Sequence, residues 1–72
     1  MATAAMLVLT TCPSAAAADR LAAALVGDRL AACVNRIDNV LSTYRWQDAV
    51  HSDQEVLLLI KTTETQIGRA HV

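Results

Sequence analysis

The sequence predicts an α+β fold that corresponds to the first two-thirds of a split β-α-β-β-α-β arrangement. Three observations carry this prediction: an apolar strand near the N-terminus, an alanine-rich helix after it, and a long stretch that folds back on itself as two strands. The first and third strands are the most continuously apolar segments, as expected of central strands. The complete arrangement also has a second helix and a last strand, and this sequence contains no segments that predict them.

The first strand is predicted at Ala5–Thr11, which is apolar on both alternating faces and therefore suits the centre of a sheet. Ser14 follows as an N-cap, because its hydroxyl can accept an orphan backbone N–H of the next turn. Ala15–Asp28 is then predicted as a helix, and Gly27 weakens its last turn. The apolar stripe of this helix consists of Ala18, Leu21, Ala22 and Leu25.

The stretch Ala31–Thr63 is predicted to form a hairpin. Its arms are Ala31–Trp46 and Gln54–Thr63, and the polar run Gln47–Asp53 between them suits a surface loop. Five consecutive apolar residues, Val56–Ile60, predict that the second arm is a strand buried on both faces. The first arm is more polar, which places it nearer the edge of the same sheet.

Length and composition predict one small domain with a thin core. The chain has 72 residues, and its hydrophobic content of 54% includes much alanine and no phenylalanine. Alanine side chains bury little surface area. We therefore expect the chain to oligomerise rather than to be stable as a monomer.

Charge and hydropathy exclude several classes of partner. The net charge of −1 gives no basic patch for nucleic acid, and no apolar run is long enough for a membrane span. No Lys or Arg precedes Arg20, so a signal-peptide n-region is not predicted, and a cytoplasmic location follows by default. Two cysteines are too few for a disulfide scaffold.

Four segments together resemble the CutA divalent-cation tolerance family: LVLTTCPS at Leu7–Ser14, LAACVNRI at Leu30–Ile37, STYRW at Ser42–Trp46 and EVLLLIKT at Glu55–Thr62. Each segment is weak alone, but their shared order and spacing are specific. The resemblance implies a ferredoxin-like fold, a tight homotrimer and a role in the response to metal ions, with copper binding in some members. It also implies likeness to the PII signalling proteins in trimer architecture.

The resemblance makes residues 1–66 a single incomplete domain, without the family's second helix, its His-Pro-Tyr segment and its last strand. Residues 67–72, IGRAHV, are interpreted as a foreign tail, because one back-translation matches a sequencing-adapter sequence; the alternative is an ordinary helix start. Two departures concern the motifs. The cysteine that some members use as a metal ligand aligns with Thr10, and Asp48 replaces the glycine that usually follows the tryptophan.

Cys12 is the candidate metal ligand, for copper or another divalent cation. It stands before the predicted helix, whose N-terminal dipole favours a thiolate; the alternative is a partly buried small residue at a strand end. Cys33 is expected to pack as a small hydrophobe. The two cysteines are predicted at opposite ends of the sheet, roughly 20 Å apart, too far to share a site within one chain.

Tyr44, Trp46 and Glu55 are predicted to lie at an interface between subunits, where the two amphipathic rings suit such a surface. Stacking on nucleic acid would instead need aromatics on the central strands together with basic residues. Lys61 is a candidate for binding an anion in an intersubunit cleft, as the PII likeness suggests, or else an ordinary exposed lysine. His51 is interpreted as a solvated loop histidine rather than a metal ligand.

No nucleophile–base–orienter set and no glycine-rich phosphate loop is seen, so we do not expect an enzyme. The sequence instead predicts a small trimeric protein of divalent metal-ion tolerance that works as a binding or scaffolding module. One alternative is a PII-like sensor that binds a small anion between subunits. Another is an enzyme that uses Cys12 as its nucleophile.

Overall fold

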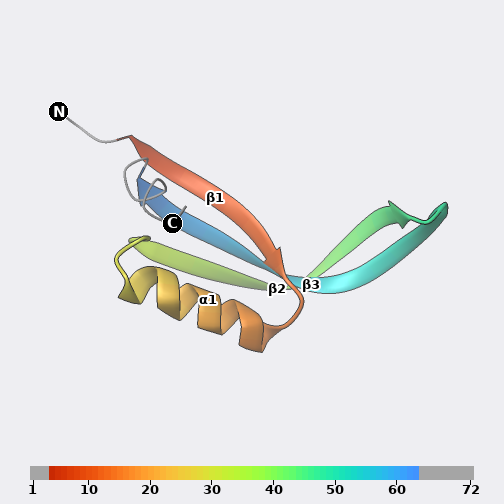
Figure 1. Cartoon of the computed structure of the whole chain (residues 1–72), viewed down its shortest axis with the longest axis horizontal. Coiled ribbons are helices and arrows are strands. Elements are labelled where there is room, and N and C mark those ends of the chain that lie inside the picture. Colours follow the sequence, from red (N-terminus) through yellow and green to blue (C-terminus); the bar gives the residue numbers. More distant parts are fainter. Residues whose placement is uncertain (1–3, 64–72) are drawn as a thin grey trace.

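The structure is a computed structural model that describes residues 4–63. The tail interpreted as foreign, residues 67–72, lies outside this range. Four elements follow one another along the chain (Figure 1): β1 (Ala5–Cys12), α1 (Ala15–Gly27), β2 (Cys33–Trp46) and β3 (Ala49–Thr63). The strands form one antiparallel sheet in the order β1-β3-β2. The predicted α+β class and the predicted order of elements are confirmed.

β1 lies at one edge of the described sheet, as the sequence predicts when the last strand of the complete arrangement, which would make β1 central, is absent from residues 4–63. All eight of its residues pair with β3, in a regular register that sets Val8 opposite Ile60. A central strand needs a neighbour on each side, and residues 4–63 provide β1 with only one. β2 forms the opposite edge, as its more polar composition predicted.

The helix begins as predicted. Ser14 has an extended backbone, and its side-chain oxygen accepts a hydrogen bond from the Ala17 N–H at 3.1 Å. The helix ends at Gly27, one residue before the predicted end. Within residues 4–63 no helix has the length and apolar character that crossing a bilayer requires.

The C-terminus of α1 is closed by a Schellman motif in which arginine takes the place usually held by glycine. The Leu30 N–H donates to the Leu25 carbonyl oxygen at 2.8 Å, and the Arg29 N–H donates to the Val26 carbonyl oxygen at 3.1 Å. Arg29 has a φ of 59°, in the left-handed region, whereas Gly27 has no positive φ. The residue that adopts the left-handed conformation at the end of the helix is therefore Arg29, and not Gly27.

The core lies between α1 and one face of the sheet. Leu58 is fully buried at the centre of β3, whereas Leu57 and Leu59, on the opposite face, are only half-buried. The predicted burial of both faces is therefore wrong for the described residues, because α1 covers one face only. Leu21, predicted to belong to the buried stripe, is exposed. The buried cluster comprises Cys12, Ala18, Ala31, Val56, Leu58 and Ile60.

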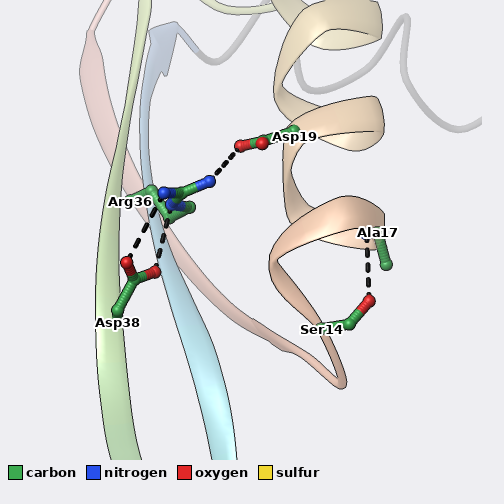
Figure 2. A network of polar contacts seen from close by, with 5 residues as sticks. All are labelled: Ser14, Ala17, Asp19, Arg36 and Asp38. Atoms are coloured by element: carbon green, nitrogen blue, oxygen red, sulfur yellow. Dashed lines mark hydrogen bonds and ion pairs between the residues drawn. The ribbon is translucent and has the colours of Figure 1, made fainter.

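An arginine joins α1 to the edge strand β2 (Figure 2). The Arg36 guanidinium donates from Nη1 to Asp19 Oδ1 of the helix at 2.6 Å, and its Nε lies 3.0 Å from Asp38 Oδ1 on its own strand. All three side chains are at least one-third exposed. Each ion pair therefore contributes little to stability, because water screens the attraction between exposed charges.

The β2–β3 hairpin continues well past the helix (Figure 1), and the described chain is accordingly elongated, at 48 × 23 × 21 Å. The register shifts between Ile37 and Val40, and Asn39 in this bulge has a φ of 61°. A bulge bends the strand and increases its twist, so the outer part of the hairpin diverges from the plane of the core.

The two arms are joined by the two-residue turn Gln47–Asp48, whose φ values are 51° and 62°. Positive φ at both central residues is the requirement of a type I′ turn. The predicted loop Gln47–Asp53 is therefore wrong: Ala49–Asp53 belong to β3 and pair with β2. Cross-strand pairing overrides their polar composition.

Candidate functional site

An aromatic and acidic group near the hairpin tip, here called the hairpin cluster, consists of Tyr44, Trp46, His51 and Asp53. Tyr44 lies opposite His51, and their rings are stacked with centroids 5.6 Å apart and planes inclined by 20°. The Tyr44 hydroxyl donates a hydrogen bond to the Asp53 carboxylate. His51 Nε2 lies 3.3 Å from the carbonyl oxygen of Trp46. His51 is therefore a strand residue with partners, not the loop histidine that the sequence predicted.

The carboxylates around Tyr44 raise the pKa of its phenol above the usual 10.0. The hydrogen bond to Asp53 is the largest cause, followed by desolvation and by the negative charges of Asp53 and Glu55. Each of these effects disfavours the phenolate, so the hydroxyl stays a hydrogen-bond donor over the whole physiological pH range.

A polar cavity of about 380 Å³ lies beside the cluster, where the hairpin meets the strand–helix junction. It is lined by Pro13, Tyr44, Asp53, Gln54 and Glu55. The structure thus brings together Tyr44 and Glu55, two of the three residues predicted to lie at an interface. Trp46, the third, is 62% exposed near the tip of the hairpin.

Cys12 is the last residue of β1 and is 6% exposed, within the buried cluster. The next residue, Pro13, lines the 380 Å³ cavity. A copper or zinc site needs several donors around one point. Among residues 4–63 no three His, Cys, Asp or Glu side chains are grouped to hold a metal ion. The described residues alone therefore do not fit a complete metal site.

Cys33 is exposed at the start of β2, so the prediction that it packs as a small hydrophobe is wrong. It pairs with Lys61, whereas Cys12 pairs with Val56, five residues away along β3. That separation is roughly 16 Å. Both thiols are free, and the prediction that they cannot share a site in one chain is confirmed.

Lys61 lies at the other end of the sheet, beside a larger open cavity of about 890 Å³. Arg29 lines the same cavity, and the sequence did not single out this residue. In the sequence, the only indication of a role for Arg29 was its position directly after the predicted helix. Within residues 4–63, the other residues that line this cavity carry no negative charge: Ala5, Met6, Leu7, Val26, Ala31, Ala32, Thr62 and Thr63.

Comparison with known proteins identifies relatives of this fold. The family model of the CutA1 divalent ion tolerance protein matches residues 6–71. The divalent-cation tolerance protein CutA of Thermus thermophilus is 57% identical over 56 residues, which cover 78% of this chain and 54% of that protein. The chain therefore spans about half the length of this relative.

Solved structures show the same similarity in three dimensions. The divalent cation tolerance protein of Thermus thermophilus superposes with a TM-score of 0.86 at 48% identity, over 92% of this chain and 64% of that chain. CutA1 of Ehrlichia chaffeensis gives a TM-score of 0.90 at 32% identity, over 96% of this chain and 64% of that chain.

The strand order, the single covered face and the protruding hairpin define a ferredoxin-like α+β protein of the CutA type. The chain belongs to the CutA1 divalent ion tolerance protein family. The resemblance that four short sequence segments indicated is thereby confirmed.

Proposed function

We propose that this chain acts in divalent metal-ion tolerance as a homotrimeric binding or scaffolding module of the cytoplasm. Its family is named for tolerance of divalent ions, which supports the metal-related role. Two free cysteines suit a reducing compartment.

The observation that carries the oligomeric part of this proposal is the exposed hairpin. An isolated two-stranded hairpin is marginally stable in water. Here one face of such a hairpin presents two large aromatic side chains to solvent, those of Tyr44 and Trp46. The half-buried leucines on the uncovered sheet face add to this surface. Contact with other copies of the chain would shield the hairpin and the uncovered sheet face from water.

The assembly is tested by sedimentation equilibrium, where a trimer is expected and a monomer at micromolar concentration would contradict it. Trp46→Ala should weaken the trimer by about 2 kcal/mol or more, since buried aromatic anchors dominate interfaces. Val50→Ala is the matched control, because Val50 is equally exposed but pairs with Arg45 on the other face of the hairpin. An unchanged midpoint of trimer dissociation in the Trp46→Ala variant would show that Trp46 does not lie in the interface.

We further propose that Cys12 contributes one ligand to copper and that Cys33 does not. Cys12 lies at the N-terminal side of α1, next to a polar cavity, whereas Cys33 lies at the opposite end of the sheet. The remaining donors would come from outside residues 4–63 or from another subunit.

Titration with Cu²⁺ of the Cys12→Ser and Cys33→Ser variants tests this ranking. Cys12→Ser should lose most of the binding, and Cys33→Ser should keep it. Equal losses from the two substitutions would reject the ranking.

The second candidate is a PII-like sensor of a small anion, and the shared cavity of Arg29 and Lys61 favours it. Among residues 4–63, two cations and no carboxylate line that space, which suits an anionic ligand. A melting temperature that rises with an anion such as phosphate but not with Cu²⁺, and no longer rises in Lys61→Ala, would favour this candidate over metal binding.

A further inference from the structure

Trp46 lies at the end of β2, where the residue opposite gives it little support. It is the last residue of the strand and pairs with Ala49 across the two-residue turn. An alanine is too small to cover an indole, and Trp46 is 62% exposed. Two larger neighbours share its face of the hairpin. Tyr44 precedes it by two residues, and His51 lies diagonally across on β3.

His51 contacts both of these β2 residues. Its ring stacks on the ring of Tyr44, with centroids 5.6 Å apart and planes inclined by 20°. Its Nε2 lies 3.3 Å from the carbonyl oxygen of Trp46. A carbonyl oxygen only accepts, so Nε2 carries the proton of this hydrogen bond, in the neutral ring and in the imidazolium alike. The imidazole therefore connects the Tyr44 side chain with the Trp46 backbone.

Tyr44 is itself held in place. Its hydroxyl donates a hydrogen bond to the Asp53 carboxylate, two residues beyond His51 on β3. The contacts thus run from Asp53 through Tyr44 and His51 to the backbone of Trp46, and they cross between the two strands at each step. Exposed chain segments with few buried contacts open locally at little cost in free energy. This series of contacts opposes such opening at Trp46.

An exposed anchor residue binds more tightly when it is held in place before contact. Association has to order side chains and loops that move in the free protein, and this ordering opposes binding. Trp46, whose backbone is already tied to His51, loses less freedom when a partner covers its indole.

We propose that His51 is a positioning residue for Trp46, and that the partner for which it positions the indole is a second copy of this chain. The imidazole holds the Trp46 backbone through Nε2, so the indole meets the neighbouring subunit in a fixed direction. This inference rests on the proposed trimer and on the place of Trp46 in its interface.

Sedimentation equilibrium of two His51 variants tests the effect on assembly. His51→Ala should lower the association constant of the trimer about tenfold, because each trimer contains three such anchors. His51→Gln should stay within about twofold of the parent, since its amide N–H can donate to the Trp46 carbonyl in place of Nε2. Ser52→Ala, on the other face of the hairpin, is the control and should also stay within about twofold. Equal losses in His51→Ala and His51→Gln would overturn the proposal.

A double-mutant cycle separates this inference from the trimer proposal. In a Trp46→Ala background, His51→Ala should cause little further loss of association, because its effect passes through Trp46. If each substitution weakens the trimer and the two losses add, His51 does not act through Trp46 and the inference fails. If Trp46→Ala leaves association unchanged, the proposed interface fails, and with it the second copy as the partner of Trp46.

Time-resolved fluorescence anisotropy tests the positioning without reference to assembly. Trp46 is the only tryptophan, so the signal reports its motion alone. It is recorded on variants whose circular dichroism matches that of the parent. The fast component of depolarisation should grow in His51→Ala and remain at the parent level in His51→Gln. A fast component that is the same in His51→Ala and in the parent would overturn the role of His51, even in a protein that forms the trimer.

Discussion

At the scale of single residues, the Tyr44–Asp53 contact shows how one hydrogen bond ties together the two arms of the hairpin. Tyr44 lies on β2 and Asp53 on β3, in the part of the hairpin that continues past the helix (Figure 1). The neighbouring ladder adds only a hydroxyl contact of 3.2 Å between Thr43 and Ser52 and the stacked ring of His51. Polar and aromatic pairs thus take the place of a core in this part of the molecule.

This contact predicts a pH dependence of stability. The folded-state pKa of Tyr44 is raised above its unfolded value near 10.0. Its contribution to stability is therefore fully present below pH 10 and is lost as the pH rises through the folded-state pKa. Tyr44 is the only tyrosine, so phenolate absorbance reports on it alone.

Absorbance titration should give a midpoint above 10.0 in the parent protein and a lower one in Asp53→Asn. Asp48→Asn, which removes a carboxylate at the turn, is the control. A parent midpoint at the value of free tyrosine would mean that the hydroxyl does not bind Asp53 in solution.

At the scale of elements, the hairpin turn carries conformational strain. Gln47 and Asp48 both have positive φ, and a side chain in the left-handed region costs about 1–2 kcal/mol relative to glycine. Asp48 stands where the resemblance to the family leads one to expect glycine. The sequence could not reveal a two-residue turn here, because neither residue is the Asn-Gly or Asp-Gly signal on which turn assignment relies.

Asp48→Gly should therefore stabilise the protein by about 1 kcal/mol, since it removes the left-handed strain at one turn residue at some entropic cost. The measurement is a thermal or urea melt. Ser52→Gly, within β3, should instead destabilise by about 0.5–1 kcal/mol. A loss of stability in Asp48→Gly would show that the aspartate side chain contributes more than the backbone conformation costs.

The same elements show which features of this chain a sequence can predict. Ser14 was found because an N-cap needs one hydroxyl at one position, and the helix follows from apolar residues spaced three and four positions apart. The start of β3 at Ala49 was not found, since polar residues enter that strand only by pairing across the hairpin. The link between Tyr44 and Asp53 was missed for the same reason, because it depends on the position of the turn. Arg29 was missed because its position beside the same cavity as Lys61 depends on how α1 packs on the sheet.

At the scale of the whole molecule, the core is thin for the length of the chain. Among the large side chains of residues 4–63, Leu58 alone is fully buried, and two of the six residues of the buried cluster are alanines. The other sheet face and the hairpin leave leucine, tyrosine and tryptophan side chains in contact with water. In the proposed trimer, contacts with other copies would cover these side chains and stabilise each folded subunit by mass action.

Leu58→Ala should consequently abolish or severely weaken cooperative folding. A buried leucine replaced by alanine costs about 2–5 kcal/mol, through lost apolar contact and the cavity that remains. Small domains have a free energy of unfolding of only about 5 kcal/mol at the lower end. The melting temperature should therefore fall by at least about 10 °C, given roughly 4–8 °C per kcal/mol for a chain of this size.

Leu41→Ala is the matched control for this prediction, because Leu41 is 65% exposed on the hairpin while Leu58 is fully buried. It should change the stability of the subunit by about 0.5 kcal/mol or less. Equal melting temperatures for the two variants would show that the α1-covered face does not form the core. A Leu58→Ala protein that melts cooperatively only at high protein concentration would instead show that assembly compensates for the weakened core, because association stabilises the folded subunit by mass action.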